Sequence, residues 1–222
     1  MITVAVRAGF FFVIFALVAF WEAAAQRRQL AFSRGERWPS NLALVLFNSL
    51  AVYWLLPISA LGMSEVAASH RWGLLRHCDA PYWPALMLTV VLMDFSIYLQ
   101  HVMFHAVPIL WRLHRVHHAD MDYDVTTGLR FHPIEIFLSL LIKMAVVAIL
   151  GPPQSGVLAF EVLLNGTAMF NHGNIAMPVG LDRILRLFVV TPDMHRVHHS
   201  VAACEANSNF GFNLPWWDRL CG

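Results

Sequence analysis

Apolar residues run through this chain in long stretches that polar and charged residues separate. Three of them, residues 8–25, 41–63 and 84–105, are long enough to cross a membrane, which takes about 20 apolar residues. The first predicts a retained anchor, because no clear cleavage site follows its apolar core, and Pro57 predicts a kink in the second. Residues 134–150 and 156–170 flank a Gly-Pro-Pro-Gln-Ser break and predict either two crossings or a short hairpin that enters from one side.

Composition supports a membrane protein. Hydrophobic residues make up 58% of the 222 residues and charged residues 13%, whereas soluble domains contain about 25% charged residues. We therefore expect an all-α integral membrane protein of about four transmembrane helices, with a helical cap that carries the histidines described below. We expect one membrane domain over 1–222, divided into N-terminal spans and loops (1–83) and a core (84–222).

The charges exclude one class of partner and suggest an orientation. A net charge of +1, with no basic stripe, argues against nucleic-acid binding. The positive-inside rule assigns the arginine-rich loops to the cytoplasm, in the inner membrane of a bacterium or the endoplasmic reticulum of a eukaryote. Eleven arginines share that side: Arg27, Arg28, Arg34, Arg37, Arg112, Arg115, Arg130, Arg183, Arg186, Arg196 and Arg219.

The cysteines do not suggest a site. Cys78, Cys204 and Cys221 form no C-x-x-C pair, so they indicate neither a zinc ribbon nor a disulfide framework. We expect them to be small buried residues.

Histidines are the chain's chemical signature. The pentapeptide HRVHH occurs at 114–118 and again at 195–199, and an H-x-x-H-H spacing places its imidazoles on one face of a helix. Both copies fall on the predicted cytoplasmic face, so they can meet. Ten of the twelve histidines are candidate metal ligands: His101, His105, His114, His117, His118, His132, His172, His195, His198 and His199.

Ten imidazoles are too many for one ion. They suit two ions with about five nitrogens each, which leaves an open position on each for oxygen or substrate. A structural zinc is complete with four ligands, and the carboxylate-bridged di-iron bundles use a Glu-x-x-His helix that this chain lacks. We infer iron from the chemistry that such a site would serve; nitrogen ligands alone would also accept zinc.

A polar stripe on the third span supports this hypothesis. Asp94, Tyr98, His101 and His105 recur along one helical face. A carboxylate inside a membrane span costs about 2.5–3.5 kcal/mol on insertion scales, so it should have a partner. The prediction is an imidazole N–H that points away from a metal, with Asp193 and Asp120 in similar roles. The alternative for Asp94 is a hydrogen bond that only packs helices.

Six blocks, DFSIYLQHVMFH, LWRLHRVHHAD, TTGLRFHPIE, NHGN, TPDMHRVHHS and NSNFGFNLPWWDRLCG, resemble the fatty acid hydroxylase and sterol desaturase superfamily of integral membrane oxygenases. The resemblance covers roughly residues 84–222. It implies a histidine-bound di-iron centre, dioxygen as co-substrate, and hydroxylation or desaturation of a lipid C–H bond. It also assigns the ten histidines as ligands, Asp94 and Tyr98 to a lead-in motif, and Asn209, Gly211, Trp217 and Asp218 to a C-terminal signature. No H-P-G-G haem motif occurs, so electrons are expected from a separate reductase, of cytochrome b5 or ferredoxin type.

Two non-enzymatic functions are also compatible with a membrane protein rich in histidine. A membrane metal carrier would place ligands along the middle of its spans, whereas these lie at span ends and in loops. A haem or quinone electron carrier leaves the two H-x-x-H-H copies unexplained, because haem accepts only two axial nitrogens.

Overall fold

The computed structural model describes residues 2–222, which are helical apart from loops and an isolated bridge between Gln26 and Ile175. The long helices are α1 (Ile2–Ala24), α2 (Arg34–Leu55), α5 (Tyr82–Ala106), α7 (Pro133–Leu150) and α8 (Gln154–Asn171). The shorter ones are α3 (Ala60–Ser69), α4 (Leu74–His77), α6 (Pro108–His118), a 3-10 turn (Thr127–Leu129), α9 (Val179–Leu185), α10 (Pro192–His198), α11 (Ala203–Ala206) and α12 (Trp216–Cys221).

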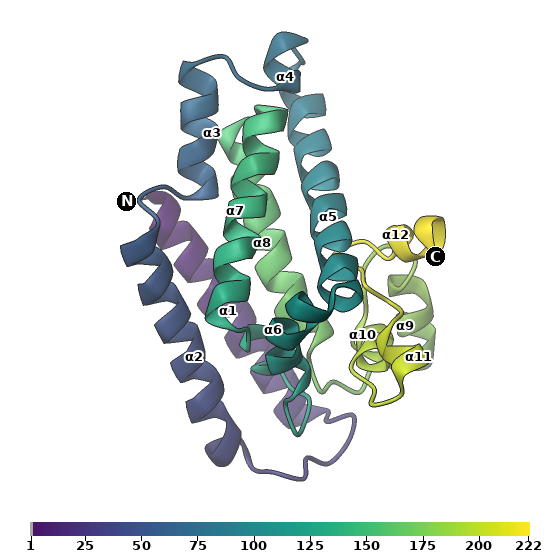
Figure 1. The fold of residues 1–222 in the computed structure, drawn as a ribbon. Helices are drawn as coiled ribbons and strands as arrows, with labels where there is room; N and C mark the ends of the chain where they lie inside the picture. The colour runs from purple at the N-terminus through teal and green to yellow at the C-terminus, as the bar shows by residue number, and fades with distance from the viewer. Residues whose placement is uncertain (1) are drawn as a thin grey trace.

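The helices form a bundle with a cap at one end (Figure 1). Helix α8 lies at the centre, where α1 and α5 both pack against it, and α3 packs against α7. Met93 and Ile97 of α5, Met144 and Val147 of α7 and Phe160 of α8 belong to the main buried cluster. Helix α6 lies below the lower end of α5, and α9–α11 lie beside it at the lower right of the view.

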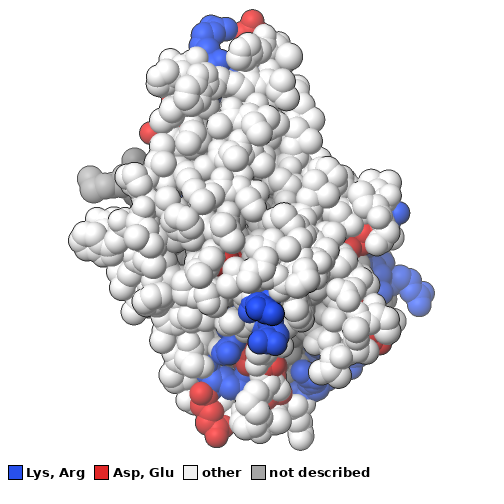
Figure 2. All heavy atoms as spheres, in the orientation of Figure 1, with Lys and Arg blue, Asp and Glu red and all other residues white. Residues whose placement is uncertain are grey.

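Four segments are long and apolar enough to cross a membrane: Ala5–Ala24, Arg34–His77, Tyr82–Ala106 and Pro133–Leu150. The all-α, multi-pass prediction is confirmed. Large apolar side chains face outward along these helices, among them Phe20 (73% exposed) and Trp54 (80% exposed). Figure 2 shows a largely white middle, with most of the charged side chains toward the two ends. Helices α7 and α8 have 18 residues each, about 27 Å of length.

Pro57 has a stronger effect than the predicted kink. Helix α2 ends at Leu55, and Leu56 is extended (φ −121°, ψ 109°) before α3 begins at Ala60. A residue that precedes proline is driven out of the helical region, so the predicted second span is broken in two. The cysteine expectation is wrong, since Cys78, Cys204 and Cys221 are all exposed.

Prolines set the starts of three helices that carry or flank histidines. Pro108, Pro133 and Pro192 stand in the first turn of α6, α7 and α10. Proline suits this position because its missing N–H would have no intrahelical partner there, and its φ is already helical. The position at which each helix starts determines which of its side chains point toward the capped end of the bundle.

Candidate metal centre

Four elements deliver histidines to the cap end of the bundle. Helix α5 presents His101 and His105 one turn apart, just before it ends at Ala106. Helices α6 and α10 each carry one HRVHH copy, and His172 caps the C-terminus of α8. Segments far apart in the sequence therefore converge on one volume.

Nine histidines form two groups, in each of which one nitrogen per ring lies within 4.8 Å of all the others. The five-histidine group consists of His101, His105, His114, His118 and His198. The four-histidine group consists of His117, His172, His195 and His199. The groups adjoin each other, because the rings of His118 and His199 stack at 4.3 Å between centroids.

Each HRVHH copy is divided between the two groups. In the first copy His114 and His118 join the five-histidine group, while His117 joins the other. In the second copy His198 joins the five-histidine group, and His195 and His199 join the other. Neither copy makes a site alone, which explains why the sequence contains two.

In several of these histidines, the ring nitrogen that faces away from the group is hydrogen-bonded to a backbone carbonyl. Nδ1 of His101 lies 2.8 Å from the carbonyl oxygen of Phe210, and Nδ1 of His198 lies 2.8 Å from that of Ser208. Nδ1 of His172 lies 2.6 Å from the Ala168 oxygen. A carbonyl can only accept, so each Nδ1 carries the proton and each Nε2 carries a lone pair that faces inward.

The inward nitrogens fit metal ions. Nε2 of His101 and His114 approach to 3.1 Å, as do those of His172 and His117. When the Nδ1 atoms of both rings carry the proton, the two Nε2 atoms face each other with their lone pairs, which repel. Ligands at right angles around an ion about 2.1 Å away lie about 3 Å apart, so a bound cation turns this repulsion into coordination. Nε2 of His118 and His198 is buried with no hydrogen-bond partner among the described residues.

Burial keeps these rings neutral. Desolvation is the largest cause that lowers the pKa of His118 to about 2, followed by repulsion from neighbouring histidines. Desolvation likewise lowers the pKa of His172 to about 4 and that of His195 well below its usual range. Neutral imidazole is the form that binds a metal.

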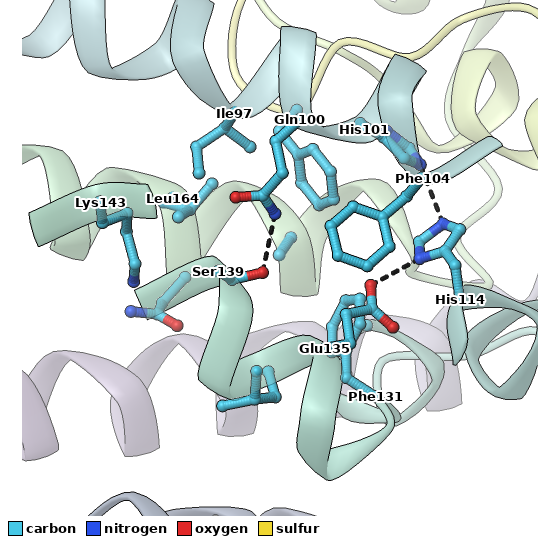
Figure 3. A pocket seen from close by; sticks show the side chains of 15 residues that line it. Ile97, Gln100, His101, Phe104, His114, Phe131, Glu135, Ser139, Lys143 and Leu164 are labelled. Carbon is cyan, nitrogen blue, oxygen red and sulfur yellow. Dashed lines mark hydrogen bonds and ion pairs between the residues drawn. The ribbon is translucent and has the colours of Figure 1, made fainter. Parts of the chain in front are cut away.

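A cavity of about 160 Å³ reaches the five-histidine group from inside the bundle. It lies between α5, α7 and α8, with His101 and His114 at one end (Figure 3). Phe104 and Phe131, two of the aromatic residues near the histidine blocks, line it. On another side, an open groove of about 770 Å³ borders His118 and His199.

Comparison with known proteins decides the family. The fatty acid hydroxylase model matches residues 86–222. The chain belongs to the fatty acid hydroxylase family. It is 32% identical over 170 residues to an ornithine lipid hydroxylase of Rhizobium tropici, covering 75% of this chain and 49% of that protein. It is 33% identical over 180 residues to an alkylglycerol monooxygenase of Xenopus tropicalis (78% and 39%). It is 25% identical over 142 residues to human cholesterol 25-hydroxylase (62% and 50%).

The matched region spans half or less of the length of each of these relatives. No solved structure matches the chain.

Of the ten histidines that the family resemblance assigns as ligands, only His132 lies outside both groups. It is the N-cap residue of α7, where its Nδ1 accepts a hydrogen bond from the Ile134 N–H at 3.1 Å. A side chain that accepts from the first turn of a helix satisfies one of its orphan N–H groups. Pro133, directly after it, completes the helix start.

The acidic residues predicted to support histidines contact other groups instead. Asp94 accepts from the indole N–H of Trp217 at 2.7 Å and from the backbone N–H of Leu214 at 3.2 Å. Asp193 pairs with Arg27 and Arg196. The predicted Asp94–imidazole bond is therefore wrong, and the alternative of a packing contact holds. Tyr98 is buried and stacks on Phe95; its hydroxyl has no hydrogen bond within residues 2–222.

The family's C-terminal signature builds the wall behind the five-histidine group. The Asp218 carboxylate accepts from the backbone N–H groups of Phe210 (2.7 Å) and Gly211 (2.9 Å). A Cβ on Gly211 would lie 2.8 Å from the backbone oxygen of Leu214 and 2.9 Å from that carboxylate, so only glycine allows the approach. This clamp fixes the Phe210 carbonyl that orients His101. Through Trp217, Asp94 anchors the same segment to α5.

Two supports escaped prediction from the sequence. Glu135 lies 2.6 Å from Nδ1 of His114 and lines the cavity. It follows His132 by three residues in the block RFHPIE, which was the available signal. Arg37 pairs with Asp120 (2.8 Å) and Asp124 (2.7 Å), all three buried or nearly so. This network ties α2 to the loop that ends at Arg130, whose carbonyl accepts from Nδ1 of His117.

Proposed function

We propose that this protein is a membrane-bound di-iron oxygenase that uses dioxygen and external electrons to hydroxylate a lipid C–H bond. The observation that carries the proposal is the pair of adjoining histidine groups, one of which borders a cavity inside the bundle. Family membership and the names of the relatives, which are hydroxylases or monooxygenases of an ornithine lipid, an alkylglycerol and cholesterol, support it. We favour hydroxylation over desaturation because it needs one hydrogen abstraction, without a second precisely placed one.

The bound irons would supply activation of dioxygen, and zinc would replace them in some preparations. The chain itself would hold the ions, orient the imidazoles and shield the cavity from water. Carbonyls of Phe210, Ser208 and Ala168 fix the imidazoles that face the ions. Phe104 and Phe131 exclude water from the cavity end where the substrate carbon would lie.

The substrate would enter from the bilayer. The cavity lies between helices that carry exposed apolar side chains on their outer faces, so a lipid would approach it from the bilayer and not from water. A sterol, a fatty acyl lipid or a related amphiphile is the proposed substrate class.

We propose that the histidine groups face the cytoplasm, by the positive-inside rule, and that a separate electron-donor protein docks on this face. Arg112 and Arg115 are exposed on α6 beside the histidines, and the open groove reaches His118 and His199. We further propose that residues 1–83 act with the core as one unit, because Arg37 of α2 supports the loop behind His117.

The test is lipid oxidation by the intact chain. Membranes that contain the protein are incubated with a reductant and dioxygen, and their lipids are compared by mass for a gain of one oxygen or a loss of two hydrogens. His117→Ala should abolish the new product, while His70→Ala, an exposed histidine near the end of α3, should retain it. Metal flux without oxygen uptake, or one haem per chain, would support a carrier instead. An unchanged lipidome across several hosts would contradict the proposal.

A further inference from the structure

Lys143 is the only lysine in the sequence, beside fourteen arginines. It lies near the middle of α7, inside a segment long and apolar enough to cross the membrane. Its side chain lines the cavity that reaches the five-histidine group. An ionisable residue in a membrane span that faces a cavity is by default a candidate for a functional role.

The Lys143 ammonium has no protein partner. Among residues 2–222, no hydrogen bond engages its Nζ and no carboxylate lies within the 4.0 Å of an ion pair. Glu161 of α8, the acidic residue of the neighbouring helix, pairs with Arg7 of α1 at 3.3 Å. The amine of Lys143 is therefore left without a hydrogen-bond acceptor from the described chain. A polar group from outside the protein can accept from it, and an anionic group would in addition favour its charged form.

A second polar group lies along the same cavity. One end of the Gln100 side-chain amide bonds to the Ser139 hydroxyl at 2.7 Å, and its other end is buried without a partner in the described chain. Figure 3 shows this pair between Lys143 at one end and His114 at the other. A plain alkyl chain would leave both Lys143 and Gln100 unsatisfied.

We propose that Lys143 binds an anionic oxygen group, a carboxylate or a phosphate, on the amphiphile that occupies this cavity. The proposal rests on the proposed function, since it names the class of substrate for that site. Glu135, which contacts His114, and Lys143 are eight residues apart on α7, which corresponds to about 12 Å along the axis. The anionic group would thus be separated by a short chain from the carbon that meets the histidine end, and Gln100 would bond to a polar group between them.

Binding of ten-carbon probes to the full chain in a non-ionic detergent tests the proposal without turnover. The probes are decanoate, decyl phosphate, 1-decanol and decyltrimethylammonium, and binding is measured by the rise in the thermal unfolding midpoint at increasing probe concentration. We expect an anionic probe to bind about tenfold or more tighter than 1-decanol, as a charge-assisted hydrogen bond provides. Comparison of decanoate with decyl phosphate distinguishes the two anion sources.

Lys143→Met should remove the preference for anions and leave 1-decanol binding within about twofold. Arg71→Met is the matched control, because it removes an exposed cation that pairs with Asp79 at the far end of the bundle. Its preference should equal that of the unmodified chain. As a second measurement, decanoate should slow the reaction of Lys143 with an amine-reactive reagent, read by peptide mass, and 1-decanol should not.

Equal binding of all four probes, or an anion preference that Lys143→Met retains, would overturn the proposal. Iron content and lipid oxidation are measured on the same preparations. If the chain oxidises lipids but shows no Lys143-dependent preference, this inference alone fails. If it binds anions through Lys143 but oxidises nothing, the proposed function fails.

Discussion

The five-histidine and four-histidine groups draw on the same pentapeptide but lie in different surroundings. The five-histidine group takes two histidines from the membrane helix α5, borders the cavity and is backed by Glu135 and the C-terminal segment. The four-histidine group takes His172 from the end of α8 and is backed by the carbonyls of Arg130 and Ala168. Only the first lies against the cavity proposed for the lipid.

The two groups therefore depend on different parts of the fold. Glu135 contacts His114 of the five-histidine group and also lines the cavity. The loop that supports the four-histidine group is tied to α2 by the ion pair between Arg37 and Asp120. A substitution among the residues that support one group should therefore weaken metal binding by that group before it weakens binding by the other.

Removal of one ligand from each group gives the largest expected effect. His114→Ala and His195→Ala should each lower bound iron from about two ions per chain to about one, and lower lipid oxidation at least about 100-fold, because even residues that only support ligands cost 10–100-fold. Metal analysis and product yield measure this. His132→Ala, which alters a helix cap, should retain both ions; loss of one ion in that variant would return His132 to the ligand set.

Arg37→Met should destabilise the fold by about 3–5 kcal/mol, because it leaves the buried carboxylates of Asp120 and Asp124 without their cation. Denaturant unfolding measures the loss, and metal analysis should show that the four-histidine group empties first. Arg27→Met removes a more exposed pair with Asp193 and should cost under about 1 kcal/mol. Similar losses in the two variants would contradict the role given to the buried network.

Glu135→Leu should weaken metal binding by the five-histidine group about 10–100-fold, since His114 loses the acceptor that orients its ring. Glu135→Gln keeps an acceptor oxygen and should retain most of the affinity. Stepwise iron titration separates the groups. Equal weakening of both groups in Glu135→Leu would show that the effect is general unfolding.

A pH dependence of the metal-free protein is also expected. Burial lowers the pKa of His172 to about 4 and that of His118 to about 2, while both titrate near 6.5 in an unfolded chain. As pH falls below about 6.5, the unfolded chain binds protons that the folded chain does not, so the free energy of unfolding decreases. Thermal unfolding between pH 7 and pH 5 measures it. A flat or opposite profile would mean that these rings are not held neutral.

Local patterns in the sequence predicted the spans and nine of the histidines that meet, because hydropathy and helical spacing are local properties. The division of each HRVHH copy between two groups was not predictable, since it depends on how α6 and α10 face each other across the bundle end. His132 could have been recognised as a cap, because a polar residue before Pro133 is a helix-start signal.

Asp94 shows a second limit of prediction from the sequence. A buried carboxylate on the histidine stripe was correctly expected to have a partner, but the partner is Trp217, more than a hundred residues later. Spacing along one helix cannot reveal a contact with a segment folded back from the C-terminus. Asp94 instead anchors the C-terminal segment to α5.

The most direct test of the account is the anomalous scattering of iron in crystals of the iron-loaded protein, measured on both sides of the iron absorption edge. We expect two peaks per chain, one surrounded by His101, His105, His114, His118 and His198, the other by His117, His172, His195 and His199. A single peak, or a peak bound to His132 with either group empty, would contradict it.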